Sequence, residues 1–161
     1  MKTSVPRFLC DEMLKGLGRW LRAAGYDTLI LEDGNDDAAL LQRAVEDGRL
    51  LLTRDRPLME YRDAPGTVIL LRCNELHECA EELTRRLGID WHYQPFSRCM
   101  VCNTPLLTAT PQQRLGIPED ARGDELVLYC PSCHKLYWEG SHVWRMRKKL
   151  QRWADGDFSP D

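Results

Sequence analysis

The sequence predicts an α/β fold in which a parallel β-sheet flanked by helices precedes a small cysteine-rich module and a basic C-terminal helix. Three observations support this prediction. Short apolar runs alternate with amphipathic segments over residues 6–88, the pattern of strands joined by helical crossovers. Four of the seven cysteines occur as two close pairs after residue 98. The stretch His142 to Trp153 holds five cations and no acid.

The first apolar run, Phe8-Leu-Cys10, ends at Asp11 and is expected to be a strand. Further short apolar runs predict strands at 28–31, 50–53 and 67–71. Runs of this length without polar alternation are typical of strands that are buried on both faces. Because helical segments separate them, the strands are expected to run parallel through right-handed crossovers.

The helical segments show apolar residues at three- and four-residue spacing. The first helix carries Leu14, Leu17 and Leu21 on one face and ends at Gly25. Two further helices are expected to end at Gly48 and Gly88, since glycine is favoured just after a helix.

These elements divide the chain into four expected parts. They are a sheet domain over 1–90, a linker without clear periodicity over 91–98, a cysteine-rich module with its basic helix over 99–154, and a flexible tail over 155–161. A length of 161 residues suits one medium domain or two small ones.

The composition is that of a globular protein, with 43% hydrophobic and 29% charged residues. The net charge of −3 does not by itself indicate nucleic-acid binding, but a local basic patch can still bind phosphates. The N-terminus does not resemble a signal peptide, and no apolar run is long enough to span a bilayer. We therefore expect a cytoplasmic protein without membrane contact, where paired cysteines more often bind metal than form disulfides.

The paired cysteines predict a structural zinc site. The pairs are Cys99 with Cys102, and Cys130 with Cys133. Each pair can direct two thiolates to one ion, and four thiolates complete a tetrahedral zinc shell. The alternatives are redox-active pairs or disulfides. Three other cysteines, Cys10, Cys73 and Cys79, lack paired spacing and are expected to be small buried side chains.

Acidic residues follow three consecutive strands. They are Asp11 after the first, Asp36 and Asp37 after the second, and Asp55 after the third. Since the carboxyl ends of parallel strands share one edge of the sheet, these carboxylates are expected to converge and to bind Mg²⁺ or Mn²⁺. The alternative is structural, because Asp36 or Asp37 also suits a helix N-cap.

A carboxylate-bound ion beside arginines is typical of phosphoryl chemistry. We expect Arg54 to act with the acids, and Arg19, Arg22 and Arg56 to hold phosphate at the same edge, although each could equally be a solvated surface cation. Hydrolysis of RNA by metal-activated water leaves a 5′-phosphate and a 3′-hydroxyl.

Four segments in this order resemble the Mut-seven C-terminal RNase family. They are RFLCDEMLKGLGRWLRAAGYDT, LLTRDRPL, RCMVCNTPL and YCPSCHKLYWEGSHVWRM. The resemblance implies a PIN-like nuclease domain followed by a zinc ribbon, with Mg²⁺- or Mn²⁺-dependent ribonuclease activity. By position, its metal ligands would be Asp11, either Asp36 or Asp37, and Asp55.

The zinc ribbon and basic helix are then expected to hold the substrate, an RNA that is structured or partly single-stranded. The residues expected to contact RNA there are Trp144, Arg145, Arg147, Lys148 and Lys149. In the alternative interpretation, the aromatic residues form the small core around zinc, and the cations only favour a helix end.

Three other classes of protein share some of these features with a nuclease. A non-catalytic zinc-ribbon protein would bind RNA or another partner through its basic helix without cleaving it. A phosphoacceptor receiver domain also places acids after strands one and three, but it needs a fifth strand followed by a lysine. A toxin of a toxin–antitoxin pair would share the nuclease chemistry, although an appended zinc module is less natural there.

Overall fold

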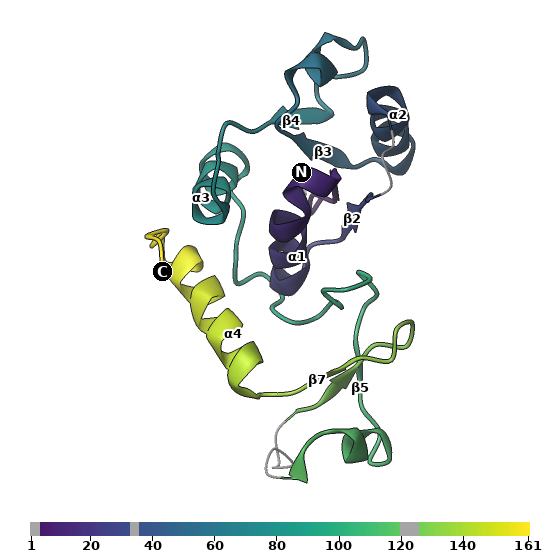
Figure 1. The fold of residues 1–161 in the computed structure, drawn as a ribbon, viewed down its shortest axis with the longest axis vertical. Helices are drawn as coiled ribbons and strands as arrows, with labels where there is room; N and C mark the ends of the chain where they lie inside the picture. Colours follow the sequence, from purple (N-terminus) through teal and green to yellow (C-terminus); the bar gives the residue numbers. More distant parts are fainter. Residues whose placement is uncertain (1–3, 33–35, 120–125) are drawn as a thin grey trace.

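The structure is a computed structural model that describes residues 4–32, 36–119 and 126–161. Its first part is a four-stranded sheet in the order β2-β1-β3-β4, with all neighbouring strands parallel. The strands are β1 (Phe8–Cys10), β2 (Thr28–Ile30), β3 (Leu50–Thr53) and β4 (Val68–Leu70). The α/β fold and the parallel sheet are thereby confirmed (Figure 1).

Helices cover both faces of this sheet. They are α1 (Lys15–Ala24), α2 (Asp37–Asp47) and α3 (Leu76–Leu87), with short 3-10 turns η1 (Glu12–Leu14) and η2 (Arg56–Glu60). Successive residues of β1 point to opposite faces, as the strand repeat requires. Phe8 and Cys10 join the core formed with α1 and α3, whereas Leu9 joins the core formed with α2.

The second part is a three-stranded antiparallel sheet in the order β5-β6-β7. Its strands are β5 (Leu107–Thr108), β6 (Leu128–Tyr129) and β7 (Leu136–Tyr137), with η3 (Gln113–Gly116) between the first two. Two small clusters stabilise it, one around Cys99, Cys130 and Tyr137 and one around Ala109, Ile117 and Val127. We call this part the ribbon.

Helix α4 (Ser141–Ala154) leaves the ribbon and returns to the first part of the chain (Figure 1). Its buried residues Met146, Leu150 and Trp153 belong to the same core as α1 and α3. The ring of Trp153 lies 5.1 Å from that of Trp20 and 4.9 Å from that of Trp91. The apolar face of α4 therefore completes the core of the sheet domain.

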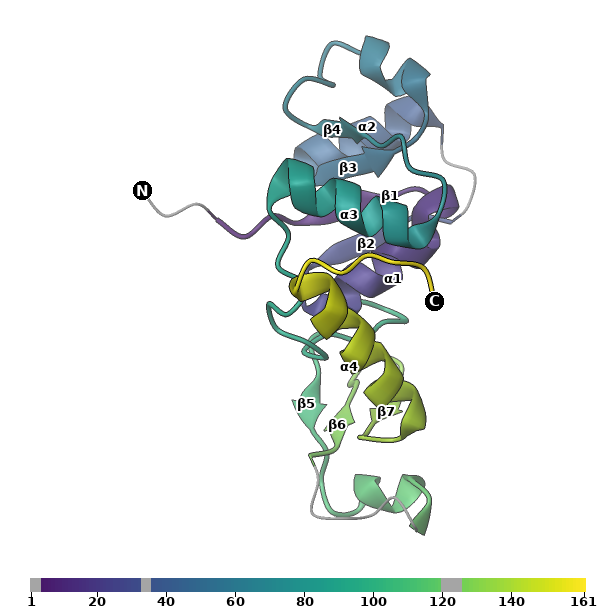
Figure 2. The same ribbon diagram turned by 90° about the vertical axis from the view of Figure 1, so that its left-hand side faces the viewer.

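Two segments differ from the sequence expectations. The expected linker 91–98 contributes Trp91 and Phe96, which are 0% and 2% exposed, to the main core. The expected flexible tail 155–161 folds back beside α3 (Figure 2), where Phe158 packs against the core. Asp161 forms ion pairs with Lys149 and Arg152 of α4.

The expectation that Cys73 and Cys79 are buried is confirmed, but the sequence did not predict that they pair. These two cysteines form a disulfide between the segment after β4 and the first turn of α3. Both are nearly buried, as expected, at 5% and 4% exposure. Their six-residue separation carries no pattern, and only the turn into α3 brings them together.

Within the described ranges, no helix is long and apolar enough to cross a membrane.

Candidate active site and zinc centre

The end of β1 is joined to the end of β3 through a buried threonine. One carboxylate oxygen of Asp11 accepts the backbone N–H of Leu14 at 3.3 Å, so Asp11 caps η1. Its other oxygen lies 3.2 Å from the hydroxyl of Thr53. The same hydroxyl accepts the backbone N–H of Asp55 at 3.0 Å. Thr53 thus fixes Asp11 and Asp55 at the carboxyl ends of adjacent strands.

The start of α2 brings two more acids to this edge. Asp36 is the N-cap of α2, and its carboxylate accepts the backbone N–H of Ala39 at 2.7 Å. Asp37 is the first helical residue. Burial raises the pKa of Asp37, and the charge of Asp55 and a hydrogen bond with its carboxyl raise this pKa further. The start of α2 thus brings Asp37 close enough to Asp55 for the two carboxyl groups to interact electrostatically.

We call Asp11, Asp36, Asp37 and Asp55 the acid edge. Burial is the largest cause of the raised pKa of Asp37. Repulsion from the carboxylates of Asp55, Asp36 and Asp11 raises this pKa further. A divalent cation would relieve the same repulsion, and carboxylate oxygens are the donors that Mg²⁺ and Mn²⁺ prefer. The chemistry of the donor set therefore fits such an ion.

The acid edge is more open than a closed one-ion cage. Across the three described ranges, the carboxylate oxygens of Asp11, Asp37 and Asp55 do not all lie within 4.8 Å of one another. Glu75, His77 and Glu78, which follow β4, do meet that spacing. This group was not expected from the sequence. Glu75 and Glu78 form a capping box at the start of α3, which accounts for both acids.

The two arginines beside Asp55 take different positions. Arg54 is half-buried, and its guanidinium donates to the carbonyls of Cys73 and Asn74 at 3.3 and 3.4 Å. It therefore holds the segment after β4 against the end of β3. Arg56 begins η2 and is exposed, so its guanidinium is free to meet solvent or a phosphate.

The four paired cysteines form one cluster, with all sulfur atoms within 4.8 Å of one another. The Sγ atoms of Cys99 and Cys133 are 3.5 Å apart, and those of Cys102 and Cys130 are 3.4 Å apart. Four thiolates at about 2.3 Å from a tetrahedral zinc ion would be separated by about 3.8 Å. No disulfide joins these four residues. The donor set and its spacing fit a closed structural zinc site.

The backbone around each cysteine pair repeats the same turn. The N–H of Asn103 donates to the carbonyl of Cys99 at 2.8 Å, and the N–H of His134 donates to the carbonyl of Cys130 at 2.9 Å. Asn103 and His134 both adopt positive φ, 73° and 65°. Such paired turns direct two thiols to a common point. Burial and hydrogen bonds with Cys99 and Cys130 raise the pKa of Cys133 to about 12.

The expectation that Arg22 contacts RNA was wrong. Arg22 is 6% exposed, and its guanidinium donates to Thr28 O at 2.8 Å, Met100 O at 3.0 Å and Val101 O at 3.1 Å. It therefore joins β2 to the first cysteine turn. Asn103 extends the same junction, because its side-chain oxygen accepts the backbone N–H of Thr28 at 3.0 Å.

The basic helix α4 separates its expected RNA contacts into two groups. Arg147 pairs with Glu139 at 2.6 Å and lies over the ring of Phe96, and Lys149 pairs with Asp161. These two cations are already engaged by the protein. The remaining expected contacts, namely Trp144, Arg145 and Lys148, are exposed, as is Arg19 on α1.

The aromatic residues of the ribbon largely serve its core. The Tyr137 hydroxyl lies 3.2 Å from the Cys99 sulfur and accepts the backbone N–H of Met100 at 3.1 Å. Trp138 packs against the cluster around Ile117.

The Mut7-C RNAse domain is the family whose model matches residues 6–150 of this chain. A human protein, exonuclease mut-7 homolog, is 32% identical to it over 101 residues, which is 60% of this chain. The same alignment covers only 12% of the human protein's length. No solved structure matches the chain.

Proposed function

Because this chain belongs to the Mut7-C RNAse domain family, we propose that it is a metal-dependent ribonuclease that leaves 5′-phosphate and 3′-hydroxyl ends. The observation that carries this proposal is that the Thr53 hydroxyl joins Asp11 and Asp55 at the ends of adjacent strands, with Asp37 close enough for the charge of Asp55 to raise its pKa. The human relative is named an exonuclease, which supports nucleic-acid hydrolysis as the reaction class.

In this proposal Asp11, Asp37 and Asp55 hold Mg²⁺ or Mn²⁺. When bound, the ion supplies a more acidic water and neutralises charge on the phosphate. Thr53 keeps Asp11 and Asp55 oriented through its hydroxyl. Asp36 has a different role, since its carboxylate is used to cap α2 and so places Asp37 beside Asp55.

The arginines of the acid edge have separate tasks. Arg56 is exposed directly after Asp55 and is suited to hold a phosphate. Arg54 positions the segment after β4 through the carbonyls of Cys73 and Asn74. The ribbon, stabilised by zinc, presents the exposed RNA contacts of α4, Trp144 and Arg145 among them.

Replacement of Asp55 tests the assignment. Asp55→Asn keeps the size of the side chain but removes a charged ligand, so cleavage of end-labelled RNA with Mn²⁺ should fall by roughly a hundredfold or more. The matched control is Asp63→Asn, an exposed residue before β4 and thus at the opposite end of the sheet. Equal turnover by wild type and Asp55→Asn would refute the site. Retained RNA binding without any cleavage by wild type would identify a non-catalytic binding protein instead.

A further inference from the structure

A groove of about 910 Å³ runs between α1, the ribbon and the first half of α4. Residues from three separate parts of the chain line it, including Trp20 of α1, Trp138 after β7 and Met146 of α4. This volume lies in the range of pockets that enclose a small organic molecule or one end of a polymer. The groove lies outside the acid edge and outside the zinc cluster.

The charge at the groove is of one sign. Arg19 and Lys135 line it and are exposed, and no acidic residue is among the described residues that do so. Arg19 makes no ion pair or hydrogen bond in the described part of the chain. The groove is thus complementary to a polyanion, even though the whole chain carries a net charge of −3.

The groove also offers flat apolar surfaces. Trp20 and Trp138 are each half-buried, so part of each ring remains accessible beside the cations. Cations alternating with accessible aromatic rings are typical of surfaces that bind unpaired nucleotides, because bases stack on the rings while phosphates meet the cations.

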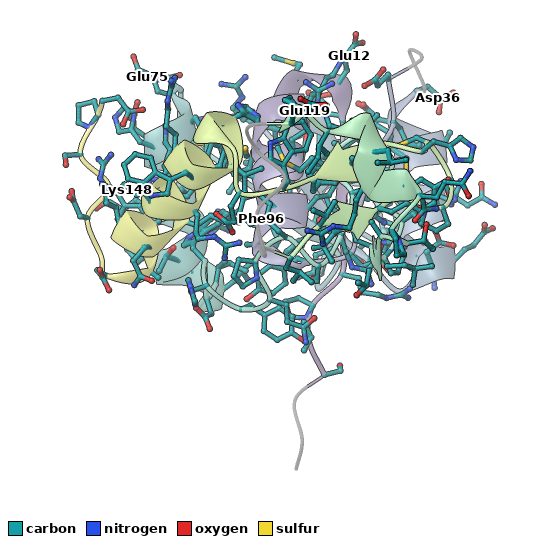
Figure 3. The ribbon with its side chains drawn as sticks, turned by 90° about the horizontal axis from the view of Figure 1, so that it is seen from below. Glu12, Asp36, Glu75, Phe96, Glu119 and Lys148 are labelled. Atoms are coloured by element: carbon teal, nitrogen blue, oxygen red, sulfur yellow. A yellow bond between two sulfur atoms is a disulfide. The ribbon has the colours of Figure 1, made fainter. Side chains whose placement is uncertain are left out.

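The groove is connected to the acid edge by α1 itself. Gly16 lines the groove and is five residues beyond Asp11. A Cβ atom added at Gly16 would meet nothing within 4 Å, so the surface there is open. In Figure 3, which is seen from below, Glu12, Glu119 and Asp36 are all labelled toward the same edge of the molecule. The groove thus reaches α1, the helix that follows Asp11 and η1.

We propose that this groove binds an unpaired segment of RNA and directs it to the acid edge. Bases lie against Trp20 and Trp138, and phosphates contact Arg19 and Lys135. This inference rests on the proposed ribonuclease function, which it deepens by specifying single-stranded RNA as the form that is bound. Base-paired RNA does not fit, since paired bases cannot present their faces to tryptophan rings.

The test measures binding separately from cleavage. Fluorescently labelled oligouridylate of about eight nucleotides, and the same length of RNA as a duplex, are titrated with full-length protein carrying Asp55→Asn. The groove variant adds Arg19→Gln and Lys135→Gln. Its matched control adds Arg62→Gln and Arg85→Gln, two exposed arginines of the sheet domain outside the groove.

The expected loss follows from counterion release. Each single-strand phosphate contact contributes about 0.7 to the slope of log K against log salt. Losing two contacts lowers the slope by about 1.4, which is roughly a tenfold weaker affinity at about 0.15 M salt. A second variant, Gly16→Leu, fills the groove without removing charge and should weaken oligouridylate binding without lowering the melting temperature, because a Cβ atom there meets nothing within 4 Å.

The outcomes separate this inference from the proposed function. If the groove variants bind oligouridylate more weakly and the control variant does not, the groove is supported as the binding site, even if the wild type with Mn²⁺ cleaves no RNA. Equal binding by the groove variant and its control overturns the groove, even if the wild type cleaves. Binding of duplex as tight as that of oligouridylate overturns it as well.

Discussion

The buried Arg22 gives the sharpest prediction about how the two parts of the chain are held together. Replacing it with methionine keeps an unbranched helix-forming side chain but removes all three donated hydrogen bonds. The carbonyls of Thr28, Met100 and Val101 then lose a charged partner. Two of these carbonyls belong to the first cysteine turn, so the change should loosen the zinc site as well as the junction.

The size of the effect can be worked from these contacts. A hydrogen bond to a charged group contributes about 1.5–3 kcal/mol, and burial of the charge offsets part of the sum. We therefore expect Arg22→Met to lower the free energy of unfolding by about 3 kcal/mol. For a chain of this length that corresponds to a fall in Tm of about 6–12 °C.

Arg19→Met is the matched control. Arg19 lies one turn earlier on the same helix but is exposed, so its replacement should change stability by less than about 0.5 kcal/mol. The assay is urea unfolding followed by tryptophan fluorescence, together with zinc content after dialysis. Equal stability and equal zinc content in the two variants would refute the reasoning. Loss of RNA binding by Arg22→Met with unchanged stability would restore its role as a phosphate contact.

Three further predictions concern the metal sites and the disulfide. Purified protein should hold about one zinc ion per chain, and Cys130→Ser should release the ion and unfold the ribbon. Metal analysis and loss of the near-ultraviolet circular dichroism signal measure these two effects, and full zinc retention by the variant would contradict the four-cysteine site. The raised pKa of Asp37 means that its charged form destabilises the folded protein, so Asp37→Asn should raise Tm at pH 7 without added divalent ions. This gain should vanish below about pH 4, where the carboxyl group is protonated in both states, and a gain independent of pH would exclude carboxylate repulsion. Cys73→Ser should lower stability by about 2 kcal/mol, the value for closing a short loop, and reductant should lower the Tm of wild type but not of the variant.

Much of the sheet could be predicted because each strand is determined locally. Phe8-Leu-Cys10 and Leu50–Thr53 are short and apolar, and both faces of such strands must be covered, so parallel pairing under helices is the solution that buries them. The same logic placed acids at one edge, since parallel strands end together. The clustering of the two cysteine pairs could also be predicted, because the two-residue spacing within each pair is a local feature of the sequence.

Other features depend on segments that meet only in three dimensions. Arg19 and Arg22 are three residues apart on one helix, yet one is exposed and the other is buried by the cysteine turn 78 residues later. Nothing local distinguishes them. Trp91 and Trp153 likewise become core residues only because α4 returns to the sheet domain.

The sequence by itself determined the elements of the parallel sheet, the four clustered cysteines and the edge at which the acids lie, because periodicity and paired spacing are local properties. The tertiary structure decided that Asp36 caps α2, which arginines remain exposed, and that Cys73 joins Cys79. Those outcomes depend on how the ends of separate elements are oriented and buried against one another, and burial is a property of the whole assembly of elements.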